Sequence, residues 1–184
     1  MSPRFTKMVL LVLALALPGY AAAQKTTQLK VGGGGSPHVR TDWTIESANI
    51  SVEYGRPSVR GRKIFGPGAL LPYGQVWRTG ADEATTLKTD KDLMFGSVAV
   101  PAGSYTLFTL PSDTTWKLII NKQTGQWGTD YDEKQDLARI DMKTEKLSQP
   151  VEQLTITIEP QSGGGVLAVA WADTRASAPF MVKR

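Results

Sequence analysis

The side chains best suited to chemistry are concentrated between residues 54 and 83. Five cationic residues lie within 23 positions, in glycine-rich segments: Arg56, Arg60, Arg62, Lys63 and Arg78. Glycine lets a backbone approach a ligand closely, and the planar guanidinium of arginine matches two oxygens of a carboxylate or phosphate. The segment therefore predicts a site for a small anion.

An alternative is that these cations only order a long loop. An arginine buried without a partner costs several kcal/mol, so loops of this kind tend to supply one. Arg56 and Arg78 have acidic neighbours in Glu53, Asp82 and Glu83. On the sequence alone we favour this structural role over the anion site.

Asp82 and Glu83 are the adjacent acids that follow Trp77, and two carboxylates are the minimum for glycoside hydrolysis. Adjacent residues on a strand point to opposite faces, so the pair shares one substrate only if the backbone bends between them. A hydrolase acting on envelope glycans through Asp82 or Glu83 is kept as an alternative function.

The five tryptophans are either core residues or stacking platforms for sugar rings. Trp116 and Trp171 lie in alternating apolar stretches and are predicted to be core, whereas Trp77 and Trp127 are the surface candidates. Trp127 is assigned equally to packing and to ligand contact. The complete set of candidate ligand-binding residues is Tyr54, Arg56, Arg60, Lys63, Trp77, Arg78, Asp82, Glu83 and Trp127.

Other kinds of active site are poorly supported. The chain has no cysteine and one histidine, His38, for which the sequence shows no catalytic partner, so we interpret His38 as an ordinary loop or strand-edge residue. Gly-x-Ser-x-Gly and nucleotide-binding fingerprints are absent. We assign no catalytic residue, metal or cofactor, and favour binding over catalysis.

The first 23 residues have the pattern of a secretory signal peptide. Arg4 and Lys7 precede an apolar run of about ten residues, and Ala21 to Ala23 suit cleavage before Gln24. The run is shorter than a membrane-spanning helix, and without cysteine there is no lipid anchor. We expect a periplasmic or secreted protein, while the sequence leaves its oligomeric state open.

The charge of the mature chain gives no reason to expect a nucleic-acid partner. Removing residues 1–23 takes two basic and no acidic residues from totals of 21 and 17, which leaves a net charge of +2. The basic residues are also scattered rather than collected on one helix.

The fold is predicted to be all-β. From Thr41 onward apolar residues recur with period two, and turn signals arrive about every ten residues. We expect one antiparallel β-sandwich or jelly-roll-like domain over residues 41–184, with nine or ten strands and one long Gly/Pro/Arg-rich loop. Residues 24–40 contain Gly32 to Gly35 and are predicted to be a flexible tether.

Three local predictions accompany this fold. Gly96-Ser97 is predicted to be the type II′ turn of a hairpin between residues 93–95 and 98–100. Val100 to Gly103 is predicted to be a type I turn that forms a second hairpin with the strand 105–110. Asp132 to Ala138 is expected to hold at most one or two helical turns.

Several motifs in fixed order resemble a bacterial family of exported proteins, domain-of-unknown-function family 2911, over roughly residues 37–182. The motifs are Tyr54-Gly55-Arg56-Pro57, residues 61–66, 76–81 and 101–108, and Asn121-Lys122 followed by residues 125–128. Asp82 stands where the resembling pattern has asparagine. The resemblance implies no activity, ligand or catalytic residue.

Our hypothesis from the sequence is an exported, non-enzymatic binding module. Its ligand would be a small anion, a carbohydrate-like molecule or another envelope component, held by the loops that carry Arg56, Trp77, Arg78 and Trp127. A purely structural interaction module is the third alternative.

Overall fold

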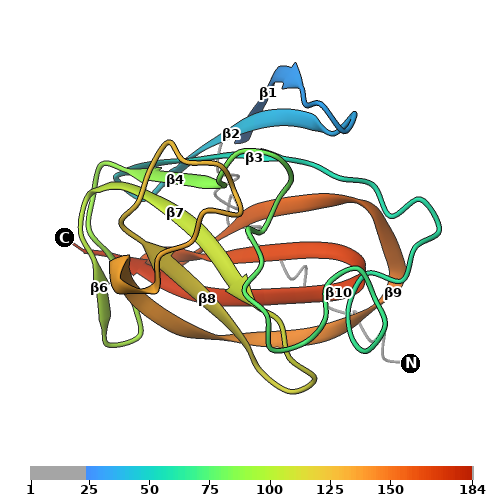
Figure 1. Cartoon of the computed structure of the whole chain (residues 1–184). Helices are drawn as coiled ribbons and strands as arrows, with labels where there is room; N and C mark the ends of the chain where they lie inside the picture. The colour runs from blue at the N-terminus through green and yellow to red at the C-terminus, as the bar shows by residue number, and fades with distance from the viewer. Residues whose placement is uncertain (1–23, 184) are drawn as a thin grey trace, which may run out of the picture.

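The described part of the chain, residues 24–183 of a computed structural model, contains ten strands and one short 3₁₀ helix, which confirms the all-β prediction (Figure 1). The proposed signal peptide, residues 1–23, lies outside the described residues. The elements are β1 (Gln24–Val31), β2 (Pro37–Ile45), β3 (Ala48–Gly55), β4 (Thr86–Thr89), β5 (Leu93–Phe95), β6 (Val98–Val100), β7 (Gly103–Leu110), β8 (Trp116–Asn121), η1 (Glu133–Gln135), β9 (Asp136–Gln161) and β10 (Gly164–Val182).

All ten strands belong to one antiparallel sheet in the order β1-β2-β3-β4-β7-β8-β9-β10-β5-β6. The 26-residue strand β9 joins its two halves: residues 136–142 pair with β8, and residues 143–161 pair with β10. In Figure 1 the ribbons of β1 to β4 lie above that of β10. The sheet thus folds over on itself, and its two halves enclose the core.

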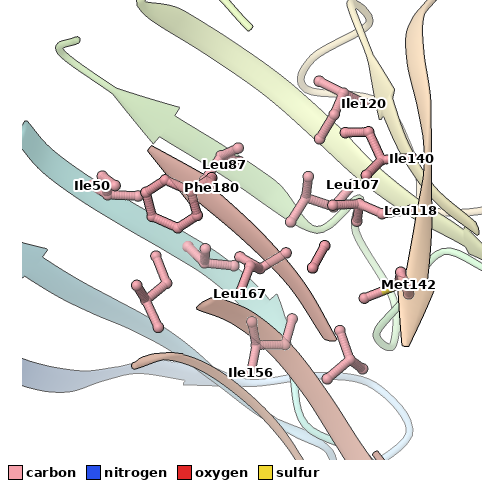
Figure 2. Close-up of a cluster of buried hydrophobic side chains, with 14 of the residues drawn as sticks. Ile50, Leu87, Leu107, Leu118, Ile120, Ile140, Met142, Ile156, Leu167 and Phe180 are labelled. Carbon is pink, nitrogen blue, oxygen red and sulfur yellow. The ribbon is translucent and has the colours of Figure 1, made fainter. Parts of the chain in front are cut away.

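The core is built from alternating apolar residues of both halves. Figure 2 shows Ile50, Leu107 and Leu118 from one half facing Ile156 and Leu167 from the other. In β9 the buried residues Leu154, Ile156 and Ile158 alternate with half-buried or exposed ones, as the period of two predicts. Each fully buried aliphatic side chain contributes about 1.5–3 kcal/mol through removal of apolar surface from water.

The predicted flexible tether differs from the structure. Residues 24–31 form strand β1, which pairs along its length with β2, and β2 begins at Pro37. Only Gly32 to Ser36 remain as a turn, closed by hydrogen bonds from Gly32 N–H to the Ser36 carbonyl (2.8 Å) and from Gly35 N–H to the Gly32 carbonyl (2.9 Å). The glycines therefore connect two paired strands.

Of the two predicted hairpins, one forms. Phe95 pairs with Val98, and Gly96 has φ = +59°, as the first central position of a type II′ turn requires. The second hairpin was wrong, because β6 pairs with β5 whereas β7 pairs with β4 and β8. The turn at Pro101 instead carries the chain from one half of the sheet to the other.

The helical content is as small as expected. Residues 133–135 form the 3₁₀ helix η1, whose first turn is capped by the Asp132 carboxylate accepting from the Lys134 N–H. Among residues 24–183, no helix has the length and apolar character needed to cross a bilayer.

Candidate functional site

The site is built around the 30-residue connection between β3 and β4, residues 56–85. Backbone hydrogen bonds attach this connection to the rest of the fold at several places, including β7 and β9. Trp77 and Thr109 exchange both backbone hydrogen bonds (2.8 and 2.9 Å), and Val59 N–H donates to the Glu152 carbonyl (2.8 Å). A loop held by backbone pairing to β7 and β9 keeps its side chains in fixed positions.

A cavity of about 500 Å³, which we call the loop cavity, opens beside this connection. Its volume lies in the range typical of small-molecule sites. Its lining combines three arginines, one carboxylate and an apolar wall: Arg60, Arg62, Arg78, Asp82, Leu70, Leu71, Trp77, Phe108, Tyr131 and Trp171. Gly34 and Ser36, from the turn between β1 and β2, also line it.

Trp77 belongs to an aromatic cluster at the inner wall of the loop cavity. It is 6% exposed and stacks on Trp171 with ring centroids 5.7 Å apart, while Phe65 packs edge-on against both indoles and against Trp116. The prediction that Trp77 is a surface residue was therefore wrong, whereas the core prediction for Trp116 and Trp171 is confirmed.

Trp171 also carries an unused polar group. Its indole Nε1 is buried and has no hydrogen-bond partner within residues 24–183. Buried donors are normally paired, so this indole N–H is an exception, and its burial keeps it out of reach of a ligand in the cavity.

Neither Arg56 nor Arg78 pairs with the acidic neighbours expected from the sequence. Arg56 donates from Nε to the Leu154 carbonyl and from Nη2 to Thr155 Oγ1, both at 2.9 Å. Arg78 donates from Nε to the Gly80 carbonyl and from Nη1 to the Asp82 carbonyl, both at 3.3 Å. The arginines do order the loop, but through carbonyl and hydroxyl oxygens, so their charges are not neutralised by these contacts.

Asp82 and Glu83 converge on one side chain, contrary to the expectation that they face apart. Asp82 has φ = +63°, and this bend brings Asp82 Oδ2 to 2.9 Å from His38 Nε2 and Glu83 Oε2 to 3.3 Å from His38 Nδ1. His38 is 6% exposed and lies on β2. The sequence did not reveal these partners of His38, because they come from a loop 44 positions away.

Glu83 is also tied to β1. Lys30 Nζ donates a hydrogen bond to Glu83 Oε1, and this contact lowers the pKa of Glu83 below its ordinary value, with a smaller contribution from the nearby His38. Because Lys30 and His38 lie on either side of the Gly32–Ser36 turn, the acid pair fixes that turn beside the loop cavity.

A sequence model of a family of proteins of unknown function, DUF2911, matches residues 36–180. The chain belongs to this family. No curated protein and no solved structure matches the chain. The DUF2911 match includes all three cavity arginines, Asp82 and the aromatic cluster, whereas β1 and Gly34 precede it.

In this DUF2911 chain four of the predicted site residues line the loop cavity: Arg60, Trp77, Arg78 and Asp82. The other five lie elsewhere. Tyr54 is buried in the core, where its hydroxyl accepts from Ile156 N–H (2.9 Å), and Lys63 donates to the Pro67 carbonyl (2.7 Å). Trp127 is 48% exposed and does not line the cavity. Arg56 and Glu83 are also outside the cavity lining.

The second wall of the cavity comes from the loop that carries Trp127, but it is formed by Gly128, Thr129 and Tyr131 rather than by Trp127 itself. Gly128 N–H donates to the Asp82 carbonyl (3.0 Å) and brings this segment against the β3–β4 connection. No metal-binding group of three or more His, Cys, Asp or Glu side chains occurs in residues 24–183.

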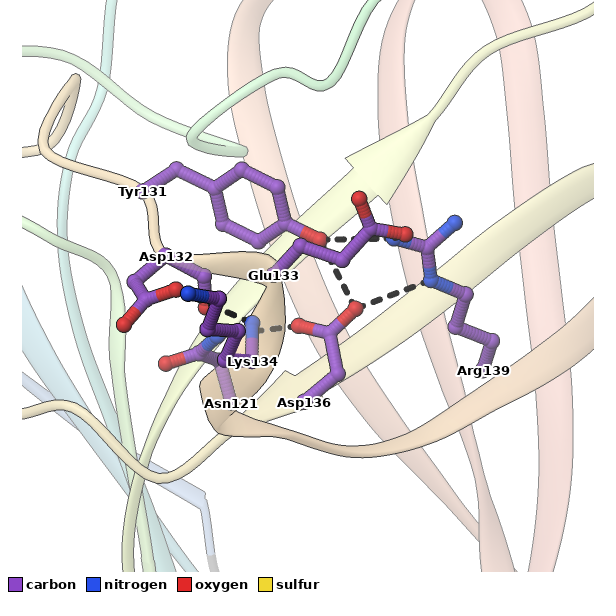
Figure 3. A network of polar contacts seen from close by, with 7 residues as sticks. All are labelled: Asn121, Tyr131, Asp132, Glu133, Lys134, Asp136 and Arg139. Atoms are coloured by element: carbon purple, nitrogen blue, oxygen red, sulfur yellow. Dashed lines mark hydrogen bonds and ion pairs between the residues drawn. The ribbon is translucent and has the colours of Figure 1, made fainter.

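Tyr131 anchors that second wall through the network in Figure 3. Its hydroxyl donates to Asp136 Oδ2 (2.7 Å) and accepts from Arg139 Nη2 (2.8 Å). Its ring packs edge-on against Phe108, another cavity residue. Burial and the bond to the Asp136 carboxylate together raise the pKa of Tyr131 to about 12.

Tyr131→Phe is expected to remove a pH-dependent part of the stability. The folded pKa of Tyr131, about 12, is above the unfolded value of about 10, so its contribution is complete below pH 10 and is lost as the pH rises to 12. In urea unfolding, the difference between wild type and Tyr131→Phe should shrink over this interval. A difference that stays constant from pH 9 to pH 12 would contradict the assignment.

Proposed function

We propose that this DUF2911 protein is an exported binding module that holds a small organic anion in the loop cavity. The observation that carries the proposal is the charge of the lining, in which Arg60, Arg62 and Arg78 face a single carboxylate, Asp82. Asp82 is itself engaged by His38. An anionic ligand would balance the positive charge of the arginines that Asp82 alone leaves uncompensated.

The hydrogen bonds of these arginines support the same conclusion. Arg62 donates to the Val59 and Ser58 carbonyls and Arg78 to two carbonyls of its own loop, and none of the three cavity arginines forms an ion pair within residues 24–183. Carbonyl oxygens fix the direction of a guanidinium while leaving its full charge. Guanidinium groups arranged in this way suit a bidentate carboxylate or phosphate.

The apolar part of the lining selects for an organic ligand. Leu70 is 47% exposed at the cavity, and the half-buried Leu71 provides further apolar surface. A bare inorganic ion would leave this apolar surface in contact with water, whereas a ligand with an apolar group or a sugar ring would cover it. The proposed ligand therefore combines an anionic group with a compact carbon skeleton.

Hydrolysis by the acid pair is less well supported. Asp82 bonds to His38, Glu83 bonds to Lys30, and both imidazole nitrogens of His38 face carboxylates. A general base needs a free lone pair within reach of a substrate proton. These contacts suit the fixing of a loop better than proton transfer.

Calorimetric titration of residues 24–184 with acetate, benzoate, glucuronate and phenyl phosphate tests the proposal. At least one organic anion is expected to bind saturably, and Arg78→Gln should weaken it by about tenfold or more, the usual worth of a hydrogen bond to a charged group. The control is Arg40→Gln, which removes an exposed arginine paired with Asp42 and Glu53 away from the loop cavity.

Thermal unfolding of both variants separates loss of binding from loss of fold. Arg78→Lys keeps the positive charge but lacks the planar guanidinium that can donate two parallel hydrogen bonds. This variant is expected to bind with intermediate affinity. Absence of saturable heat from every anion with folded wild-type protein would refute the proposal, as would equal weakening by the Arg40 and Arg78 substitutions.

A further inference from the structure

The turn between β1 and β2 presents unused hydrogen-bond donors to the loop cavity. Its two internal bonds use the N–H groups of Gly32 and Gly35. The N–H groups of Gly33, Gly34 and Ser36 have no acceptor within residues 24–183, and Gly34 and Ser36 line the cavity. Successive free backbone N–H groups in a turn form a concave site for an anion.

This turn is held in place before any ligand arrives. Lys30 bonds to Glu83 on one side of it and His38 to Asp82 on the other. Gly32 packs so closely on Asp82 that a Cβ there would overlap the carboxylate. Donors that are already positioned cost less entropy when they bind a ligand.

Arg60 places a guanidinium at the same edge of the cavity. Its Nη2 is 3.6 Å from the position that a Cβ on Gly35 would take. Its backbone is fixed by a bond from Arg60 N–H to Glu152 Oε1 (3.0 Å), and φ = +49° is a conformation that non-glycine residues rarely adopt. Its side chain has no ion-pair or hydrogen-bond partner within the described chain.

The charge and number of these donors suit a phosphate group better than a carboxylate. Three arginines against one aspartate give the lining a formal charge of +2, and a phosphomonoester carries about −1.5 to −2 at pH 7. A carboxylate offers two acceptor oxygens, whereas a phosphomonoester offers three terminal ones. The N–H groups of Gly34 and Ser36, which line the cavity, add donors to those of the arginines.

We propose that the loop cavity takes a phosphomonoester with an apolar or aromatic substituent, and that the Gly32–Ser36 turn and Arg60 bind its phosphate. The substituent lies against the apolar part of the lining, of which Leu70 and Leu71 are the most accessible residues. This inference rests on the proposed function and assigns a role to the glycine run that the anion hypothesis left unused.

The test compares phenyl phosphate, inorganic phosphate and benzoate by calorimetry, with Gly34→Pro and Gly34→Ala as matched variants. Nothing lies within 4 Å of a Cβ built on Gly34, its φ is not positive, and its N–H takes no part in the turn's internal bonds, so neither substitution removes a bond of the turn. Proline removes the N–H and alanine keeps it. Wild type is expected to bind phenyl phosphate at least about tenfold tighter than either other probe. Gly34→Pro should lose about tenfold of that affinity, and Gly34→Ala almost none.

Each other result has a defined meaning. Benzoate binding as tightly as phenyl phosphate, or Gly34→Pro binding like wild type, would overturn the inference and leave the anion module standing. Inorganic phosphate binding as tightly as phenyl phosphate would overturn the part concerning the substituent. If no anion binds folded wild-type protein, the proposed function fails and this inference fails with it.

Discussion

Trp77→Ala is expected to lower the free energy of unfolding by about 3–5 kcal/mol, the range for truncating a buried tryptophan. The indole is 6% exposed, stacks on Trp171 at 5.7 Å and meets Phe65 at 5.8 Å. Its removal leaves a void at the inner wall of the loop cavity that the neighbouring rings fill only partly. Urea unfolding followed by far-UV circular dichroism measures the loss.

Trp127→Ala is the matched control for this prediction, because it removes the same side chain from a loop where it is 48% exposed. Its cost should stay below about 1 kcal/mol, as for other surface substitutions. If the two variants lose equal free energy of unfolding, the contacts of Trp77 with its aromatic neighbours do not contribute to stability. Trp77→Phe keeps part of the ring contact and should lie between alanine and wild type.

The contrast between these tryptophans shows what the sequence could predict. Trp116 and Trp171 lie in strands where every second residue is apolar, so their burial follows from local periodicity. Trp77 lies in a glycine- and proline-rich loop without such a pattern. Its burial results from pairing with Thr109, a contact across 32 positions that no local rule contains.

The candidate site was predictable in composition but not in geometry. The clustering of arginines within residues 56–78 indicated an anion site, and Arg60 and Arg78 do line one cavity. Whether an arginine reaches the cavity depends on which carbonyl oxygens it binds. Arg56 lies outside the cavity because it donates to a carbonyl of β9. The His38 contacts depend on the positive φ of Asp82, a conformation that aspartate tolerates but does not require.

The Gly32–Ser36 turn illustrates a further limit. Four consecutive glycines have little to bury, so composition alone predicts a flexible tether. The order of this turn comes from strands β1 and β2 on either side and from the Lys30 and His38 contacts with the acid pair. Such contacts join residues far apart in sequence, and the composition of the turn does not reveal them.

Gly55→Ala is expected to destabilise the protein by about 3 kcal/mol, the upper end of the range for overpacking, and to abolish the proposed anion binding. Gly55 ends β3 opposite His38, and a Cβ there would overlap the Ala81 carbonyl oxygen and lie 2.9 Å from His38 Nε2. The φ of Gly55 is not positive, so this glycine is required for the close approach of two backbones rather than for a special turn.

The added methyl group must displace either Ala81 or His38, and both moves disturb the same site. Ala81 precedes Asp82, so its displacement breaks the 2.9 Å contact with His38 and shifts the Arg78 loop. Gly33→Ala is the control: it adds a methyl group where nothing lies within 4 Å and should leave the unfolding midpoint unchanged or slightly raised. Wild-type unfolding and anion binding in Gly55→Ala would show that the His38 contacts do not position the loop cavity.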